Sequence, residues 1–527
     1  MKKGKFQFNR RLENKKQQDE DVNSNPITGE DFLIQGSIDE ESGDRWLGSD
    51  LSKSLRFYQK AYTSYLQAIE LSNNSLLDCY YNSARLLFSV YSSYFKEDVD
   101  MSGLTNVDEV FNARVSVVQP LTNIVKAHEL AINIARSSTG RIPFDLLFNT
   151  VVVYTELLEI EQENPNSDFN YLIEIFLKIK ELLMILMEGQ VIELENFVQE
   201  LTSQVNNEPT SVTPSSSEVG EQHQEELSEE EVVQPVDLYE TVIASYKSIQ
   251  ALYENVTNEQ HLIHVNDIIS QLLELTDRLS STLVEKFSET SVVKNDMLAN
   301  ITQDQINQLF LNKTVILGLA TTDINQVLEI WQNSELPNIP ERYMIASDNI
   351  QALIDRNDLA VSPDKELFWK CLSQQSTLLK RAQELLNETY IARKKIPSGV
   401  EQGLGSLICQ LSEIMIARAD LEVQRSSIPD LEISSRNRDV LLTNVRNLLK
   451  SAMNIANSNG GLREKITEKL QREKKKSQAV FRLCLVENRI SVEELDQIMT
   501  RKRWTIELPA IQKLGYYNQF GVQNLQP

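Results

Sequence analysis

The chain has 527 residues, of which 41% are hydrophobic, and it contains only 17 glycines and 14 prolines. The length exceeds that of one ordinary core and turn-forming residues are too scarce for a large sheet protein, so the sequence predicts an all-α fold of several domains or one long solenoid. A formal net charge of −24 argues against nucleic acid as the main ligand, because most of the surface repels phosphates.

Residues 1–42 are rich in charged and amide side chains and poor in apolar ones. Such a composition buries too little surface to fold, so we predict a disordered N-terminal tail. Its first sixteen residues are basic, which suits either a nuclear-import or partner-binding arm or a merely solvated tail. The segment lacks the apolar run of a signal peptide. We therefore expect a protein of the nucleus or the cytoplasm.

Residues 43–203 read as consecutive amphipathic helices, and the clearest unit is a helical hairpin near the start. Apolar and aromatic side chains recur every three or four residues, as in Leu55, Tyr58, Tyr62, Tyr65 and Ile69, which places them on one helix face. Most of the hairpin's tyrosines should be core residues, and a subset is a candidate groove lining. The candidate partner contacts are Tyr58, Tyr62, Tyr65 and Tyr81.

Three more helical segments follow in this region: 107–135, 143–162 and 169–203. We expect a break in the first near Pro120, because proline cannot continue a helix. The third contains the most apolar run of the chain, residues 171–187, but Lys178 and Lys180 interrupt it. We interpret it as a helix packed on several sides rather than a membrane span.

Residues 204–236 predict a disordered acidic linker between two helical halves, since Pro, Ser, Gly and Glu replace the apolar periodicity. Fifteen acidic residues and no Lys or Arg occur between residues 181 and 246. Glu229, Glu230 and Glu231 are candidate contacts for a basic partner, and Ser228 beside them is a candidate phosphosite. The alternative is a solvated spacer.

Residues 237–503 form a second helical region with no sustained β alternation. Trp331 and Trp369 lie within its amphipathic patterns and are expected in the core. Its clearest helical segments are 242–256, 262–287, 305–331, 340–354, 365–394, 404–424 and 440–456.

The C-terminal part of the chain is locally basic. Residues 463–513 contain thirteen Lys and Arg residues but only eight Asp and Glu residues. Lys474, Lys475 and Lys476 are candidate partner contacts, and 501–503 is a second basic cluster. Residues 504–527 are a polar and aromatic tail, which either docks in extended form or is loose.

No motif supports catalysis. His261, His264 and Asp267 are spaced so that they could bind a metal ion from one face of a helix. The sequence offers no matching ligand pair elsewhere. We therefore expect them to be ordinary polar surface residues without a metal. The glycines of 399–405 have no following Gly-Lys-Ser/Thr, so a nucleotide is not expected either. Four widely separated cysteines suggest buried, reduced thiols. We therefore expect a non-enzymatic protein without a cofactor.

Residues 50–95 resemble a tetratricopeptide-type hairpin. Ser54, Tyr58 and Ala61 match the small, aromatic and small positions of that family's second helix, and Tyr80 and Ala84 match a following first helix. The first helix is longer than in the family, the usual proline after it is absent, and no 34-residue repeat continues beyond about residue 100. The resemblance implies an α-solenoid that binds a protein or peptide in its groove.

The sequence thus favours a protein–protein interaction scaffold or adaptor. One alternative is an acidic escort for a basic client such as a histone or ribosomal protein, drawn by the acidic linker. Another is a subunit of a larger complex whose basic C-terminal region contacts nucleic acid.

Overall fold

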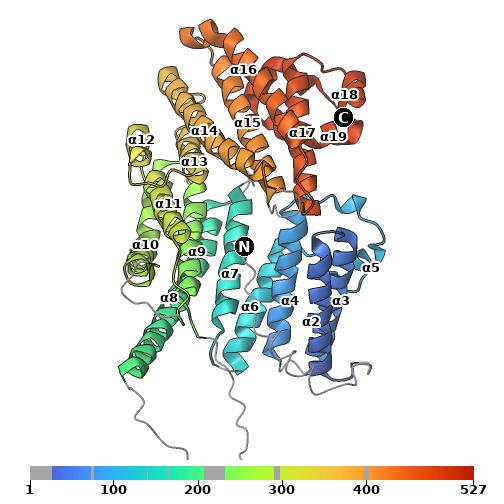
Figure 1. Cartoon of the computed structure of the whole chain (residues 1–527), viewed down its shortest axis with the longest axis vertical. Coiled ribbons are helices and arrows are strands. Elements are labelled where there is room, and N and C mark those ends of the chain that lie inside the picture. The colour runs from blue at the N-terminus through green and yellow to red at the C-terminus, as the bar shows by residue number, and fades with distance from the viewer. Residues whose placement is uncertain are drawn as a thin grey trace, which may run out of the picture. The chain divides into compact units, whose positions relative to one another are not determined.

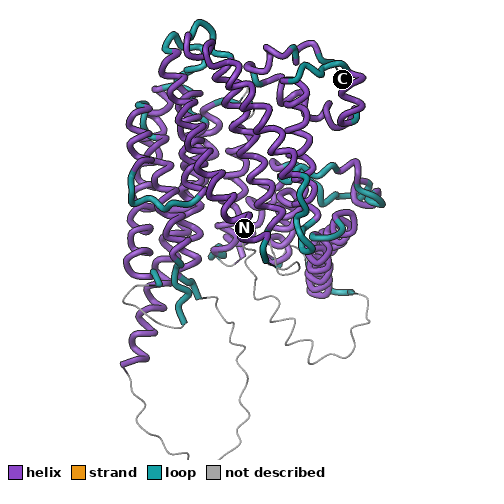
Figure 2. The backbone as a smooth tube through the Cα atoms, turned by 45° about the horizontal axis from the view of Figure 1, so that its top comes forward, coloured by secondary structure: helices purple, strands orange, loops and turns teal. Residues whose placement is uncertain are grey.

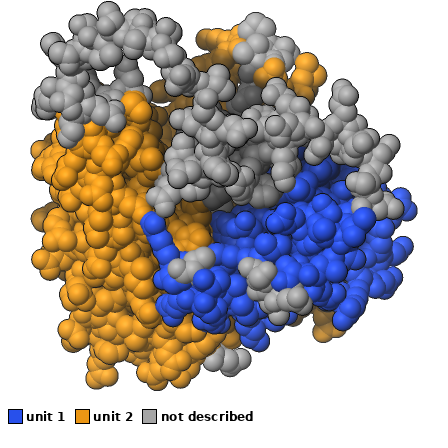
Figure 3. Space-filling model, turned by 90° about the horizontal axis from the view of Figure 1, so that it is seen from below, with its two compact units in different colours: residues 1–141 blue, residues 142–527 orange. Residues whose placement is uncertain are grey.

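The computed structural model describes residues 26–72, 76–138, 140–162, 164, 167–206, 232–289, 297–396 and 403–526. Helices dominate these ranges, and no strand forms in them beyond one isolated bridge between Ser288 and Ile301 (Figures 1 and 2). The predicted all-α fold class is confirmed. The chain divides into two compact units, residues 1–141 (unit 1) and 142–527 (unit 2), coloured blue and orange in Figure 3.

Within unit 1, α3 packs between α2 and α4, and α6 packs against α4. The break expected at Pro120 is confirmed, because α6 begins at the next residue. After α4 the chain makes a π-helical turn over Tyr91–Phe95. The described helices of unit 1 are α2 (Gly29–Leu47), α3 (Leu51–Leu71), α4 (Leu77–Val90), α5 (Asp108–Phe111) and α6 (Leu121–Ser138).

Two glycines allow α2 and α3 to approach closely. A Cβ atom on Gly43 would lie 2.5 Å from the ring of Tyr58, and one on Gly36 would collide with the ring of Tyr65. Both rings are fully buried. The hydroxyl of Ser54 donates to the Gly43 carbonyl at 2.8 Å. Close approach of this backbone therefore requires glycine on α2.

One buried carboxylate joins three helices of unit 1. Glu40 of α2 accepts a hydrogen bond from the hydroxyl of Tyr65 on α3 at 2.8 Å. It also forms an ion pair with Arg85 of α4 at 2.8 Å. Burial and the Glu40 charge raise the pKa of Tyr65 well above its usual value, so the hydroxyl stays a donor.

In unit 2, helices that follow one another pack as hairpins, such as α7 with α8, α9 with α10, α13 with α14 and α15 with α16. The first helices of successive hairpins also touch, α7 on α9, α9 on α11, α11 on α13 and α15 on α17 (Figure 1). This is the stacked, solenoid-like arrangement of antiparallel hairpins that the sequence predicts. The helices are α7 (Phe144–Gln162), α8 (Phe169–Asn206), α9 (Pro235–Glu254), α10 (Glu259–Phe287), α11 (Gln303–Leu319), α12 (Ile324–Gln332), α13 (Pro340–Arg356), α14 (Lys365–Lys394), α15 (Leu404–Ser426), α16 (Glu432–Ala456), α17 (Ile466–Val486), α18 (Val492–Met499) and α19 (Arg501–Lys513).

Buried arginines bind the carboxyl-terminal ends of helices in unit 2. Arg356 donates to the carbonyl of Leu319 at the end of α11 at 2.8 Å and to that of Tyr253 near the end of α9 at 3.4 Å. Arg472 donates to the carbonyl of Ala456, the last residue of α16, at 2.7 Å. Terminal carbonyls lack partners in their own helix and carry partial negative charge, so a guanidinium stabilises them.

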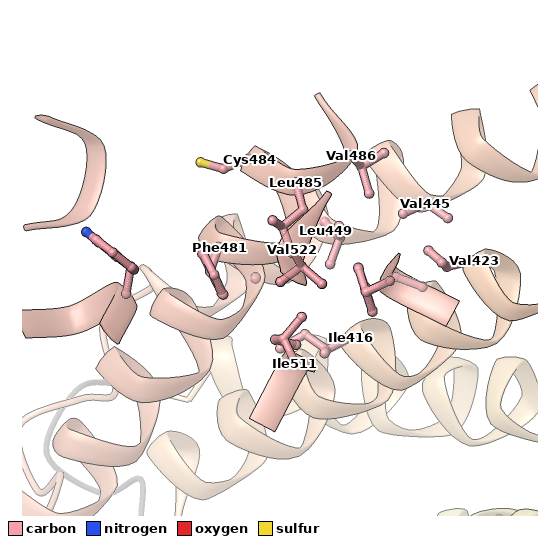
Figure 4. Packing of buried hydrophobic residues seen from close by; sticks show 14 of the residues in the cluster. Ile416, Val423, Val445, Leu449, Phe481, Cys484, Leu485, Val486, Ile511 and Val522 are labelled. Carbon is pink, nitrogen blue, oxygen red and sulfur yellow. The ribbon is translucent and has the colours of Figure 1, made fainter. Parts of the chain in front are cut away.

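The C-terminal helices share one apolar core, part of which Figure 4 shows. Trp504 and Tyr517 are fully buried in it. Arg482 of α17 pairs with Asp420 of α15 at 2.9 Å, and the Tyr517 hydroxyl donates to the same carboxylate at 2.6 Å. Residues 504–527 therefore dock, but not in extended form: they continue α19 and then make the 3-10 turns Gly515–Phe520 and Val522–Asn524.

Two predicted boundaries are wrong. Residues 29–42, assigned to the N-terminal tail, belong to α2, whose packing depends on glycines rather than on a broad apolar face. The acidic segment does not separate the compact units, because α7 and α8 before it pack on α9 after it. Residues 1–25 and 207–231 lie outside the described residues, whereas 204–206 and 235–236 are helical.

The prediction of a single helical segment over residues 305–331 is also wrong. The helix ends at Leu319, and α12 starts at Ile324. The side chain of Asp323 caps α12 by accepting from the amide of Asn325 at 2.9 Å. The expected burial of Trp331 is confirmed, while Trp369 is only half-buried beneath Arg425, whose guanidinium lies 4.3 Å from the ring centre.

Candidate functional site

The tyrosines proposed as partner contacts are mostly core residues. Tyr58 and Tyr65 are fully buried, and Tyr62 is 7% exposed. The Tyr58 hydroxyl donates to Asp44 at 2.6 Å, so its polar end is also occupied. The prediction that these three contact a partner is therefore wrong, because they form the α2–α3 interface. Tyr81 is half-buried.

The basic C-terminal clusters are largely engaged within the fold. Lys475 pairs with Glu413 at 2.8 Å, and Lys476 donates to the side chain of Asn457 at 2.8 Å. Arg501 pairs with Asp496 at 2.6 Å. Lys474 is half-buried. Lys475 and Lys476 therefore help to hold α17 in place, which the charge count alone did not indicate.

The remaining predicted site residues have varied outcomes. Glu229, Glu230, Glu231 and Ser228 lie outside the described residues, so these assignments stay predictions. His261 stacks in parallel on Phe169, with 3.7 Å between ring centres. Across the described ranges no three His, Cys, Asp or Glu side chains converge as a metal site requires.

The cysteines are free thiols, and Cys79, Cys371 and Cys484 are buried, as the sequence predicts. Cys409 is half-buried. Burial raises the pKa of the Cys79 thiol to about 12, so this thiol stays protonated and unreactive at neutral pH.

A row of carboxylates crosses successive helices of unit 2. Burial raises the pKa of Glu254 on α9, and the charge of Glu159 on α7 raises it further. Glu254 and Glu413 of α15 in turn act on Asp348 of α13. We call these four residues the acidic row. They lie on the first helices of four hairpins, whereas α11, which packs on both α9 and α13, contributes no member.

Asp348 is the member of the acidic row with a strongly raised pKa. Asp348 is solvent-exposed, yet desolvation by the surrounding protein raises the pKa of its carboxyl to about 6, with further contributions from Glu254 and Glu413. Glu413 itself pairs with Lys475 at 2.8 Å. The acidic row thus concentrates negative charge around Asp348.

The raised pKa of Asp348 predicts a pH dependence of stability. Between about pH 4 and 6 the folded state holds a proton that the unfolded chain has lost, so this group's contribution falls as pH rises through that window. The Asp348→Asn variant should gain stability relative to the wild type over the same window, by less than about 1 kcal/mol because the group is exposed. Urea unfolding at half-unit pH intervals measures this difference. A constant difference from pH 4 to 7 would contradict it.

Sequence inspection missed the acidic row, because its members lie tens of residues apart and each belongs to an ordinary polar helix face. Only the stacking of the hairpins brings them together. No short motif could have indicated it.

Comparison with known proteins adds similarity to fungal chains. The family described as the YNL193W C-terminal domain matches residues 333–517. Uncharacterized protein YNL193W of Saccharomyces cerevisiae is 23% identical over 516 residues, covering 88% of this chain and 90% of that protein. UPF0656 protein C926.02 of Schizosaccharomyces pombe is 25% identical over 441 residues, covering 81% and 84%. The similarity to both extends through most of each chain.

Among solved structures, a circular tandem repeat protein with novel repeat topology and enhanced subunit contact surfaces is 12% identical, covering 94% of this chain and 97% of that one. Its TM-score is 0.21, and a likeness at that level carries no argument. No described helix is long and apolar enough to cross a bilayer.

Proposed function

We propose that the protein is a non-enzymatic scaffold that binds a basic segment of a partner protein along the acidic row. The observation that carries this proposal is that, beyond the effect of burial, carboxylates on α7, α9, α13 and α15 are close enough to raise the pKa values of Glu254 and Asp348. Like charges spread over four helices suit an extended cationic segment better than a small ligand. The tetratricopeptide resemblance of residues 50–95 supports a protein-binding solenoid.

The charge of the whole chain supports the same partner class. A net charge of −24 attracts cationic proteins and accelerates their association. The acidic segment 204–236, anchored at both ends in unit 2, adds to that field. The client would be a basic protein of the nucleus or cytoplasm. For the nucleic-acid alternative, Lys475, Lys476 and Arg501 of the basic clusters have partners within the fold.

Replacing Glu254, Asp348 and Glu413 together by the corresponding amides should weaken binding of a labelled 20-residue peptide of alternating Lys and Gly about tenfold. Each lost ionic contact is worth about 0.2–1 kcal/mol, so three sum to roughly one factor of ten. Fluorescence anisotropy between 50 and 300 mM salt measures the affinity, and the salt dependence should become shallower.

A matched control neutralises three carboxylates on the second helices of hairpins. Glu274, Glu388 and Asp439 are exposed on α10, α14 and α16. Their replacement by amides changes the net charge equally and should leave the affinity within twofold. If both triple variants lose affinity equally, only total charge matters and the acidic row is not the site. Deletion of 217–231 separately reports whether the acidic segment contributes to the association rate.

A further inference from the structure

A hollow of about 560 Å³ lies along α3 in unit 1, and none of its lining residues belongs to the acidic row. On one side α3 contributes Lys53, Arg56, Phe57 and Lys60, and on the other the chain from Asn106 to Glu109 contributes carboxylates. A second hollow of about 380 Å³ shares Arg56, Lys60 and Glu109 with the first and extends the groove toward α2. We call the two together the α3 groove.

The far wall of the α3 groove is fastened to α3 by polar contacts. The Ser52 hydroxyl accepts from the amide of Thr105 at 3.1 Å, and Arg56 donates to the Asn106 carbonyl at 3.2 Å. The side-chain oxygen of Gln59 accepts from the amide of Val117 at 2.8 Å. The groove is therefore built into the fold and needs no rearrangement to receive a ligand.

Three cations project from α3 at positions three and four residues apart, which places them on one face. Lys53 lies over the ring of Trp46, 3.4 Å from its centre, and Lys60 lies 5.4 Å from the ring centre of Phe57. No ion pair to Lys53, Arg56 or Lys60 occurs within the residues that the structure describes. Aromatic rings hold the ammonium groups in place and leave them open to an anion.

The groove also carries three carboxylates, which come from the elements beside α3. Asp108 and Glu109 belong to α5, and Asp39 belongs to α2 and accepts from Gln35 at 3.1 Å. The hollow keeps them apart from the cations, so the two signs face each other across space instead of pairing. A purely anionic segment would meet repulsion from one side and a purely cationic segment from the other.

We propose that the α3 groove binds an extended peptide segment of a partner protein in which acidic and basic side chains alternate. Successive side chains of an extended chain point to opposite sides. Its acids would then face Lys53, Arg56 and Lys60, and its bases would face Asp108 and Glu109. This is a second binding surface, in the other compact unit and of different charge character from the acidic row.

The test uses the full-length protein with Glu254, Asp348 and Glu413 replaced by amides, so that the acidic row does not bind cationic peptides. Four labelled 12-residue peptides are compared: alternating Glu-Lys, alternating Glu-Ser, alternating Lys-Ser, and six Glu followed by six Lys. Anisotropy at 50 mM salt should show the alternating Glu-Lys peptide binding at least tenfold more tightly than each of the others. Equal or tighter binding of the Glu-Ser peptide would make the groove a simple anion site and overturn the proposal, as would equal binding of the block peptide or no binding at all.

Charge reversal locates the site. Lys60→Glu should weaken the affinity for the Glu-Lys peptide at least fivefold. Lys126→Glu, at an exposed position of α6, should leave this affinity within twofold of the starting value. The combined variant Lys53→Glu, Lys60→Glu, Asp108→Lys and Glu109→Lys exchanges the charges of the two walls and should restore binding. The alternating peptide can shift by one residue along the groove, and its acids and bases then face the opposite walls. If the exchanged variant retains wild-type circular dichroism but does not bind, the proposed alternation is wrong.

Discussion

Replacing Asp420 by alanine should lower the free energy of unfolding of unit 2 by about 3–5 kcal/mol, because the buried Arg482 guanidinium loses its counter-charge. The side chains of Arg482 and Asp420 are only 11% and 16% exposed. The Tyr517 hydroxyl loses its acceptor as well. Urea unfolding followed by tryptophan fluorescence in a Trp46→Phe background measures this change, since the other three tryptophans all lie in unit 2.

The control for Asp420 is an ion pair exposed to solvent. Arg381 and Glu384 of α14 are 41% and 47% exposed, so Glu384→Ala should cost less than about 0.5 kcal/mol. Converting the buried pair to Asp420→Leu with Arg482→Met should recover at least half of the loss, because no charge remains unpaired. A loss for Asp420→Ala as small as that for Glu384→Ala would show that the pair is not a determinant of stability.

Replacing Gly36 or Gly43 by alanine should destabilise unit 1 by about 2 kcal/mol each, although alanine is the better helix former by about 1 kcal/mol. The added methyl group would meet the buried ring of Tyr65 or Tyr58. A ring packed against two helices cannot move aside without loosening its neighbours. Hydrogen exchange resolved to α2–α4 measures the loss of protection.

Gly48, at the end of α2, is the matched control for the substitutions of Gly36 and Gly43. Its φ of −78° suits any residue, and an added Cβ would have no neighbour within 4 Å. Gly48→Ala should therefore be neutral or slightly stabilising. Equal exchange behaviour in all three alanine variants would refute the close packing of α2 on α3.

Local signals predicted much of the helical architecture. The segment 365–394 has the bounds of α14, and Pro120 marks the start of α6. In contrast, residues 29–42 of α2 were predicted to belong to a disordered tail, because the contact face of this helix consists of Gly36, Gly43 and a few larger residues. Composition identifies helices that bury many apolar side chains. It does not identify helices whose glycines allow a neighbouring helix to approach closely.

The two proposed binding surfaces were harder to predict than the fold. Helical periodicity placed Tyr58 and Tyr65 on one face correctly, but it carries no information on which face is buried beneath another helix. The three cations of α3 can be recognised in the sequence because they are three and four residues apart. The carboxylates that face them belong to other elements. The acidic row depends entirely on which hairpins become neighbours in the stack.

The arginine contacts at helix ends have a consequence for how unit 2 opens. In a simple stack each hairpin touches only the next one, so the ends can fray independently. Arg356 departs from that scheme, because from α13 it binds the ends of both α11 and α9. Opening α9 or α11 costs this buried guanidinium part of its set of acceptors. The contact therefore couples the opening of three hairpins, including those that carry Glu254 and Asp348.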